Sequence, residues 1–345
     1  MKRILIIRLT AMGDVAMTVP AVAALRAKYP DVRISILTTP FFQPFFRDVP
    51  DLDFVPFDKK GRHKGLCGIF RLWKDIHKQN DISAVADFHD VLRSKVLRTL
   101  FGLSGKKVAV INKGRAEKKA LTAPGNHVLH PLKPTIDRYG DVLGRLGYPV
   151  EIPPKPKRDP RPVPPAMAEI AGTKAGVWIG IAPFAQHRGK IYPIDNLEIL
   201  VKRLSQTPGA TLFIFGGGPK EQAVADAWAA KYPNAFSAIG KMRLPEELDL
   251  ISNLDGMVSM DSSAMHMASL CGVPVVSVWG ATHPYAGFMG WGQSGENAVQ
   301  SDLPCRPCSI YGNKPCRTGD YRCMGEITPG MIEEKIRQVA GLPPA

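Results

Sequence analysis

The sequence predicts an α/β protein made of two Rossmann-like domains that face each other across a cleft. The chain has 345 residues, of which 45% are hydrophobic and 22% charged, an ordinary composition for a globular protein with two separate cores. Short apolar runs alternate with helical patterns in both halves, as is typical of parallel sheets covered by helices on both faces. We therefore expect domains at 1–150 and 166–345, joined by the proline-rich, basic linker 151–165.

The elements of the first half follow from its apolar runs. We expect strands at 2–7, 33–38, 54–57, 84–88 and 107–111, and helices at 20–28, 66–78, 92–101 and 135–146. Parallel sheets bind ligands beyond the carboxyl ends of their strands. Asp14 and His89 each follow a predicted strand, so both are expected at that edge of the first sheet.

A second series of strands and helices follows the linker. We expect strands at 177–182, 211–215, 256–259 and 273–279, and helices at 195–204, 221–231, 245–253, 264–270 and 329–339. The same rule places the segments that follow these strands at the ligand-binding edge of the second sheet.

The most informative motif comes directly after the predicted strand 256–259. It comprises Asp261, Ser262 and Ser263, with His266 one turn into the next helix. Backbone N–H groups at a helix start lack partners and the helix dipole is positive there, so the motif predicts a site for a phosphorylated ligand. The alternative is that Asp261 or Ser262 only caps the helix and His266 is an ordinary helix side chain.

A glycine turn at 216–218 lies between the predicted strand 211–215 and helix 221–231. Glycine lets the backbone approach a nucleotide closely. Glu221 beyond the turn is a candidate acceptor for ribose hydroxyls, or it simply favours the helix start. The spacing matches neither the dinucleotide fingerprint nor the Walker loop, so redox chemistry with a dinucleotide and nucleoside triphosphate hydrolysis lose support.

The net charge of +14 indicates an anionic partner. Basic residues cluster at 59–64, 106–107, 113–119 and 155–161, with few aromatic residues among them. This distribution favours an anionic lipid or glycan over single-stranded nucleic acid, although solvated loops are the plainer interpretation. No apolar run of about 18 residues and no signal-peptide pattern occur, so we expect the chain to stay in the cytoplasm.

Several motifs together resemble glycosyltransferase family 9, and most closely the ADP-heptose:lipopolysaccharide heptosyltransferases. The resemblance rests on the segments 8–20, 190–193, 215–219, 261–266 and 272–280 and on a cysteine-bearing tail from Cys305, which occur in the family's order. It covers nearly the whole chain and implies the GT-B architecture. In many GT-B proteins the last helix crosses back to the first domain.

The resemblance implies particular roles for several residues. Asp14 matches the family's catalytic base, and Lys190 matches the lysine that neutralises the departing diphosphate. The expected nucleotide-sugar contacts are Gly13, Gln186, Glu221, Asp261, Ser262, Ser263 and His266. Two positions depart from the family: Ala185 and Gln186 replace hydroxyl residues before the lysine, and Ser263 replaces a glycine.

A second stretch of the resemblance concerns the acceptor. Residues 87–94 resemble a family segment that follows a strand, with His89 and Arg93 placed to meet anionic groups. We expect Arg62, His63 and Lys64 to form a mobile basic loop that assists them. A polar pair that holds the next helix is an equally good interpretation of His89 and Arg93.

Four cysteines lie close together in the tail, at Cys305, Cys308, Cys316 and Cys323. Only one Cys-x2-Cys pair occurs, so structural thiols are favoured over a zinc site, and disulfides are disfavoured in a reducing compartment. A similar tail occurs in the heptosyltransferase II branch. Cys67 and Cys271 are expected to be small apolar fillers.

The function that the resemblance implies is an inverting, metal-independent transfer of heptose from ADP-heptose to an inner-core sugar of lipopolysaccharide, by a cytoplasmic protein in peripheral contact with the inner face of the membrane. No cofactor and no nucleic acid partner are expected. Two alternatives remain: the same fold acting on another nucleotide sugar, and a non-catalytic anion-binding protein.

Overall fold

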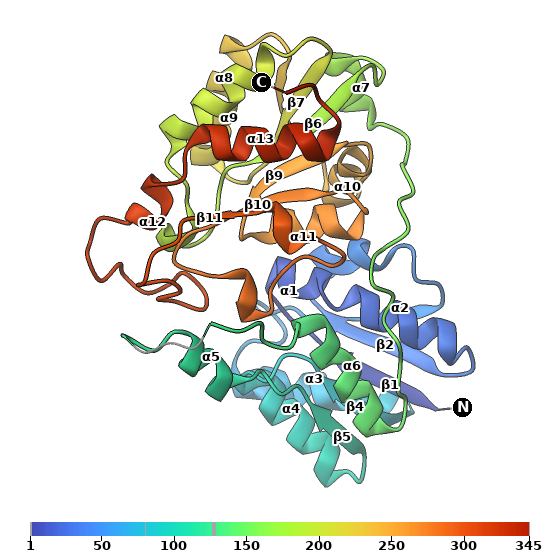
Figure 1. The fold of residues 1–345 in the computed structure, drawn as a ribbon. Helices are drawn as coiled ribbons and strands as arrows, with labels where there is room; N and C mark the ends of the chain where they lie inside the picture. The colour runs from blue at the N-terminus through green and yellow to red at the C-terminus, as the bar shows by residue number, and fades with distance from the viewer. Residues whose placement is uncertain (1, 80, 126–128, 345) are drawn as a thin grey trace. The chain divides into compact units, whose positions relative to one another are not determined.

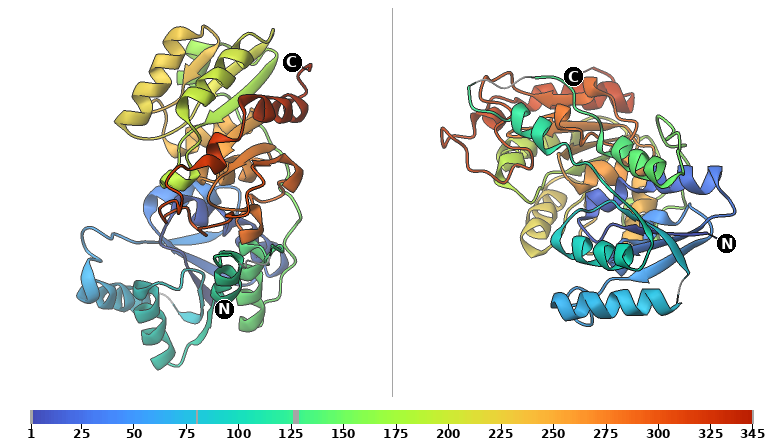
Figure 2. Two further views of the ribbon diagram at one scale, coloured as in Figure 1. Left: turned by 60° about the vertical axis from the view of Figure 1, so that its left-hand side comes forward. Right: turned by 90° about the horizontal axis from the view of Figure 1, so that it is seen from below.

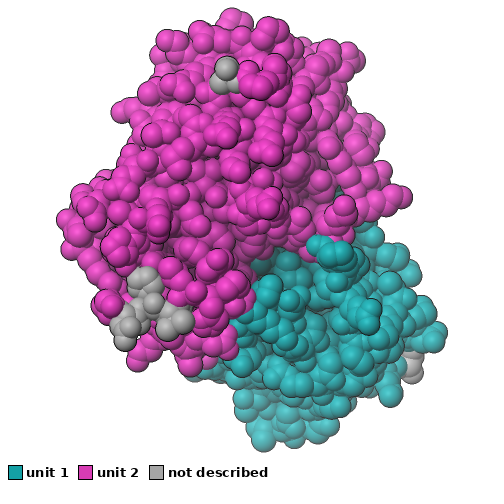
Figure 3. Space-filling model, in the orientation of Figure 1, with its two compact units in different colours: residues 1–113, 133–154 teal, residues 114–132, 155–345 magenta. Residues whose placement is uncertain are grey.

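The structure is a computed structural model that describes residues 2–79, 81–125 and 129–344. The chain forms two compact units, which Figure 3 shows in different colours. Unit 1 comprises Met1–Lys113 and Lys133–Pro154, and unit 2 comprises Gly114–Leu132 and Lys155–Ala345. No helix in the described part of the chain is both long and apolar enough to span a membrane.

Unit 1 contains a five-stranded parallel sheet with the strand order β3-β2-β1-β4-β5 (Figure 1). Its strands are β1 (Arg3–Ile7), β2 (Arg33–Thr38), β3 (Leu52–Pro56), β4 (Ile82–Asp87) and β5 (Lys107–Val110). β1 is central and buried along its whole length, as the apolar run 4–7 predicts. The strand order reverses between β1 and β4, which is where sheets of this kind bind ligands.

Helices cover both faces of this sheet (Figures 1 and 2). They are α1 (Met12–Ala16), α2 (Val19–Lys28), α3 (Gly65–Gln79), α4 (Leu92–Leu103) and α6 (Thr135–Leu146), with a 3-10 helix η1 at Pro40–Phe46. α3 packs beside α4, and α2 packs beside α6. The α3 and α4 layer buries Ile69, Leu72 and Leu97 against Leu5 and Ile7 of β1.

Unit 2 contains a six-stranded parallel sheet with the order β11-β10-β9-β6-β7-β8. The strands are β6 (Val177–Ala182), β7 (Ala210–Ile214), β8 (Ala235–Ser237), β9 (Gly256–Met260), β10 (Val275–Trp279) and β11 (Ala298–Gln300). The order reverses between β6 and β9, so the segments after these two strands border the expected ligand site. The short strands β8 and β11 are absent from the sequence prediction.

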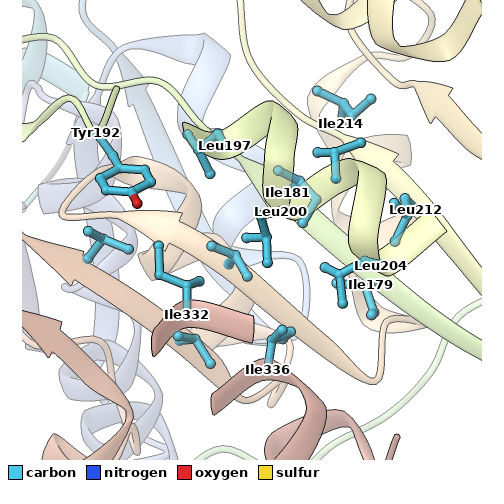
Figure 4. Close-up of a cluster of buried hydrophobic side chains, with 14 of the residues drawn as sticks. Ile179, Ile181, Tyr192, Leu197, Leu200, Leu204, Leu212, Ile214, Ile332 and Ile336 are labelled. Atoms are coloured by element: carbon cyan, nitrogen blue, oxygen red, sulfur yellow. The ribbon is translucent and has the colours of Figure 1, made fainter. Parts of the chain in front are cut away.

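The helices of unit 2 surround this sheet. They are α5 (Arg115–Leu121), α7 (Pro165–Ala171), α8 (Ile194–Ser205), α9 (Pro219–Lys231), α10 (Leu244–Ser252), α11 (Ser263–Leu270), α12 (Arg322–Gly325) and α13 (Pro329–Ala340), with 3-10 helices η2 (Arg188–Lys190), η3 (Pro284–Ala286) and η4 (Gly295–Asn297). Figure 4 shows the core, in which Leu200 and Leu204 of α8 lie with Ile179 of β6 and Ile336 of α13.

The last helix packs on the sheet of its own unit. α13 contacts α8, β6, β9 and β10, and its Ile332 and Ile336 are completely buried in the core of unit 2. In many GT-B proteins the last helix crosses back to the first domain. Here Ile332 and Ile336 of α13 pack in the core of unit 2. Their spacing of four residues places both on one face of the helix.

The boundary between the units differs from the sequence prediction in one segment. Residues 114–132, which the prediction assigned to the first domain, belong to unit 2. Lys118 of α5 lies with its Nζ 4.0 Å from the ring centroid of Phe288, and Leu132 donates its backbone N–H to the carbonyl of Tyr285. The segment 151–164 carries no helix or strand, and α7 begins at Pro165.

Candidate functional site

An ion pair lies at the point of unit 2 where the strand order reverses. Lys190 ends the segment after β6, and Asp261 directly follows the neighbouring strand β9. Lys190 Nζ is 2.8 Å from Asp261 Oδ2, and the two side chains are only 16% and 5% exposed. Gln186 is exposed in the same segment as the lysine. The structure thus brings together two of the residues that the sequence predicted for the donor site.

The backbone next to Lys190 is held by the cysteine-bearing segment. Gly189 accepts a hydrogen bond at 2.8 Å from the backbone N–H of Ala281, and the carbonyl of Ala281 accepts from Cys308 and Ser309 at 3.1 Å each. Gly189 itself is buried, and a Cβ added to it would lie 2.8 Å from that of Ala281. The tail therefore supports the lysine through main-chain contacts.

Gly312 of the same segment lies directly against the stem of Lys190. Its φ of +73° is in the left-handed region that favours glycine. A Cβ placed at this position would lie 2.6 Å from Lys190 Cγ. Sequence reasoning missed this contact, because no motif links a glycine in a loop to a lysine more than a hundred residues earlier.

Arg306 anchors the cysteine-bearing segment to the end of β10. The residue is 4% exposed. It donates hydrogen bonds to the carbonyls of Trp279, Gly280, Thr282 and Ser301 and to the side-chain carbonyl of Gln300. A buried guanidinium with this many acceptors holds several turns of chain in one arrangement.

The glycine turn after β7 is closed by Glu221. The backbone N–H of Gly217 donates to Glu221 Oε2 at 2.7 Å, and Gly218 is the N-cap residue of α9 with a φ of +87°. A Cβ at Gly216 would lie 2.7 Å from the ring of Phe184, so only glycine permits this approach of two loops. The carboxylate of Glu221 is thus engaged at the helix start, which was one of its two predicted roles.

The start of α11 has the character of an anion-binding site. Ser262 is the N-cap residue with an extended backbone, and its side chain makes no capping hydrogen bond. Its hydroxyl instead lies 3.3 Å from that of Ser259. Ser263 is the first helical residue, and His266 is buried one turn further on. The N–H groups of this turn are therefore not occupied by the Ser262 side chain, as a phosphate site requires.

A second charged cluster lies at the point of unit 1 where its strand order reverses. Arg8 follows β1, is buried, and donates to the carbonyl of Phe88 at 2.9 Å. Its guanidinium also forms an ion pair with the carboxylate of Asp14. Asp14 lies in the first turn of α1 after the N-cap residue Ala11, so it is not itself the N-cap. Its side chain is 34% exposed.

His89 lies in the same cluster in its neutral form. Its Nδ1 accepts the backbone N–H of Leu9 at 3.3 Å, which places the ring proton on Nε2. Burial and the neighbouring cations Arg8 and Lys113 lower the pKa of His89 to about 3. The side chain therefore meets a ligand as a neutral hydrogen-bond donor and not as a cation.

Arg98, which the sequence analysis did not single out, organises the segment after β4. Its guanidinium lies 2.7 Å from Asp87 and 2.9 Å from Asp90. The other oxygen of Asp87 accepts the backbone N–H groups of His89 and Asp90. Arg93, the predicted residue, is exposed at the start of α4. Its helical spacing of five residues from Arg98 places the two on different sides of the helix.

The basic loop before α3, which we expected to be mobile, contains a hydrogen-bonded turn. The carboxylate of Asp58 accepts the backbone N–H groups of Lys60, Gly61 and Arg62, which lower its pKa. Arg62 also pairs with Asp75 at 2.7 Å. The neighbouring His63 is buried and stacks on Phe57, whereas Lys64 is exposed.

The cysteines of the tail surround a small void. All six cysteines of the chain are free thiols. Cys305, Cys308, Cys316 and Cys323 line a cavity of about 20 Å³ together with Arg306. Burial raises the pKa of Cys308, and that of Cys323 to about 11, so both stay protonated at neutral pH. Among the residues that the structure describes, no group of histidine, cysteine or acidic side chains is arranged to hold a metal ion.

The two remaining cysteines differ from each other. Cys271 is partly buried, with its Sγ 3.5 Å from the carbonyl oxygen of Leu248. Cys67 is exposed on α3, so the expectation that it fills an apolar gap is wrong. The helical pattern of α3 points Ile69 and Leu72 to the core, which turns Cys67 outward.

Each of the two parallel α/β units thus carries a charged cluster at the point where its strand order reverses, the usual ligand-binding place of such sheets. The model of glycosyltransferase family 9 (heptosyltransferase) matches residues 69–319. The chain therefore belongs to glycosyltransferase family 9.

Known relatives agree with this membership. The lipopolysaccharide core heptosyltransferase OpsX of Haemophilus influenzae is 21% identical over 82% of this chain and 80% of its own length. The solved structure of Escherichia coli ADP-heptose lipopolysaccharide heptosyltransferase II has a TM-score of 0.71 at 17% identity, with 99% of this chain and 98% of that chain covered. This likeness confirms the predicted GT-B fold class.

A more distant solved structure is TibC of enterotoxigenic Escherichia coli H10407, described as an iron-containing dodecameric glycosyltransferase. Its TM-score is 0.57 at 13% identity, with 98% of this chain and 76% of that chain covered. The fold is thus shared with a protein that contains a metal.

Replacement of Gly312 tests the support of Lys190. In Gly312→Ala the new Cβ meets the Lys190 stem, and we expect kcat to fall by about tenfold or more as the ammonium is displaced. The matched control is Gly319→Ala: its φ of +80° imposes the same backbone strain, but nothing lies within 4 Å of the new Cβ. Steady-state kinetics with the sugar donor compare the two. Equal losses in both variants would contradict the proposed support.

The charge state of His89 is accessible to NMR. The ring resonances of His89, assigned with His89→Gln, are expected to show no titration between about pH 5 and pH 8, because the pKa lies near 3. The unfolded chain takes up a proton on this residue near pH 6.5 and the folded chain does not, so the free energy of unfolding falls as the pH falls from about 6.5. A titration midpoint near 6.5 in the folded protein would refute this description.

Proposed function

We propose that this glycosyltransferase moves a heptose from ADP-heptose to an inner-core sugar of lipopolysaccharide. The observation that carries the proposal is the Lys190 and Asp261 pair, which lies beside the start of α11 where the strand order of unit 2 reverses. An ammonium and a helix start together provide the positive potential that a nucleoside diphosphate requires. The names of the relatives, heptosyltransferases of the lipopolysaccharide core, supply the sugar and the acceptor class.

Lys190 acts on the leaving group in this proposal. The ammonium has further N–H groups beside its contact with Asp261, so it also meets the diphosphate of the donor and neutralises the negative charge that develops there as the glycosidic bond breaks. The proposed contacts to the nucleotide sugar remain Gly13, Gln186, Glu221, Asp261, Ser262, Ser263 and His266. Of these, Glu221 keeps its hydrogen bond to the glycine turn and contacts the ribose with its other oxygen.

Asp14 is the proposed base. It accepts the proton of the acceptor hydroxyl while that oxygen forms a bond to the anomeric carbon and the carbon–oxygen bond to ADP breaks. A single displacement of this kind inverts the anomeric configuration. Arg8 holds the Asp14 carboxylate in position through their ion pair, and Arg8 is itself fixed by the Phe88 carbonyl.

The transfer step is proposed to need no metal ion. Lys190 and the first turn of α11 already provide positive charge at the diphosphate site, which is the role a divalent cation would otherwise have. Addition of EDTA is therefore expected to leave the transfer rate unchanged.

The acceptor is proposed to contact unit 1 at the edge that holds His89. The neutral His89 donates from Nε2, and the exposed Arg93 and Lys64 meet phosphate or carboxylate groups of the glycolipid. Arg62 contributes less in this proposal because Asp75 already binds its guanidinium. An acceptor anchored in lipid places the enzyme at the cytoplasmic face of the membrane, without a nucleic acid partner.

Replacement of Asp14 separates catalysis from binding. Asp14→Asn keeps the size of the side chain but removes the proton acceptor, and we expect kcat to fall by about 10²- to 10⁴-fold while the Kd for ADP changes by less than about threefold. Asp31→Asn, at an exposed position of unit 1, is the control and should retain full activity. Transfer is measured by release of ADP in the presence of acceptor. Unchanged turnover in Asp14→Asn would overturn the assignment of the base.

A further inference from the structure

The outer side of α3 carries large apolar side chains that the core of unit 1 does not use. Leu66 is 66% exposed and Phe70 is 45% exposed, and their spacing of four residues places them together on one face of the helix. The adjoining face buries Ile69, Leu72 and Ile76 against the sheet. Single exposed apolar residues are common, but two large ones in adjacent turns form a patch that indicates an interaction surface.

Cations surround this patch. Residues 58–78 contain seven lysines or arginines and two aspartates. Both aspartates are occupied within the same segment, Asp58 by backbone N–H groups and Asp75 by Arg62. Lys74 Nζ lies 5.0 Å from the ring centroid of Phe70, and the other exposed cations of the segments that form α3 and the turn before it include Lys59, Lys60, Lys64 and Arg71.

The patch extends to the edge of the sheet where the candidate acceptor residues lie. α3 and α4 lie side by side, as both views of Figure 2 show with α3 in light blue, and each begins beyond the carboxyl end of the strand before it. Leu92, the first residue of α4, is 73% exposed and is followed by the exposed Arg93. His89 lies three residues before Leu92, so the surface and the candidate acceptor site share one edge of unit 1.

We propose that this α3 surface, formed by Lys59, Lys60, Leu66, Phe70 and Lys74, docks on an anionic phospholipid bilayer. Leu66 and Phe70 enter the interfacial region, and the lysines meet lipid phosphates. The combination of apolar and cationic side chains fits this partner, because a second copy of the same surface would bring cations against cations. The purpose of such docking depends on the proposed function, because an acceptor anchored in lipid reaches the site only if the enzyme lies at the membrane.

Vesicle binding by the full chain tests the proposal without donor or acceptor. Vesicles of phosphatidylethanolamine with about one-quarter phosphatidylglycerol should bind the protein at least tenfold more tightly than phosphatidylcholine vesicles, and this preference should disappear in roughly 0.5 M salt. Two variants address the two components of the surface: Leu66→Ser with Phe70→Ser, and Lys59→Glu with Lys60→Glu. Each should weaken binding to the anionic vesicles by about tenfold.

Matched controls change the same side-chain types elsewhere. Leu103→Ser alters a leucine that is 82% exposed at the other end of α4, and Lys157→Glu with Lys202→Glu makes the same change of net charge at exposed positions of unit 2. These controls should bind vesicles within twofold of the unaltered protein. Equal binding by the surface variants and their controls, or equal binding to both kinds of vesicle, would overturn the proposal. A dimer of the unaltered protein that dissociates in Leu66→Ser with Phe70→Ser would also overturn it, because a second copy would then occupy the surface.

Activity on a soluble acceptor separates this inference from the proposed function. With a delipidated core oligosaccharide, the surface variants should transfer sugar within twofold of the unaltered protein, because none of the altered residues belongs to the proposed site. Loss of transfer in these variants alone would contradict a role limited to docking. Absence of transfer by the unaltered protein would instead refute the proposed function and leave the vesicle result intact.

Discussion

The ion pair between Lys190 and Asp261 is the interaction on which the rest of the candidate donor site depends. Both side chains are largely shielded from water, so their attraction is stronger than that of an exposed pair, and each would be costly to leave alone. The pair keeps an ammonium at the edge of the sheet when no diphosphate is present. A diphosphate that contacts the ammonium beside the carboxylate therefore finds its cation already in place.

The position of the pair follows from the order of the strands. In a parallel sheet, the segments that leave two neighbouring strands in opposite directions separate at their carboxyl ends and leave room for a ligand. β6 and β9 create this arrangement in unit 2, and β1 and β4 create it in unit 1, where Arg8, Asp14 and His89 gather. The two units thus use one topological rule for two chemically different clusters.

The cysteine-bearing tail packs against the segment that carries Lys190. Its main chain bonds to Ala281, which bonds to Gly189, and Gly312 lies against Lys190. Arg306 fastens the same segment to the end of β10. Buried, protonated thiols at Cys308 and Cys323 fit a packed support for the lysine.

Local sequence patterns predicted the two parallel sheets well, because buried strands of such sheets are short apolar runs that turns and helices separate. They also indicated Asp261 and the start of α11. Sequence patterns did not predict three contacts, because only the folded chain brings the residues of each pair together. These are the contacts of Gly312 with Lys190, of Arg98 with Asp87 and of Lys118 with Phe288. Sequence patterns did not predict the neutral state of His89 for the same reason, because its pKa depends on burial and on Arg8, eighty-one residues earlier in the chain.

The most direct test of the central claim is a calorimetric titration with ADP, UDP and GDP in the presence of EDTA. It compares the unaltered protein with Lys190→Ala. The account predicts that ADP binds most tightly, without a metal, and that Lys190→Ala weakens its binding by about tenfold or more because a charge-assisted contact to the diphosphate is lost. Absence of nucleotide binding, or equal ADP affinity in the two proteins, would contradict a diphosphate site at Lys190 and Asp261.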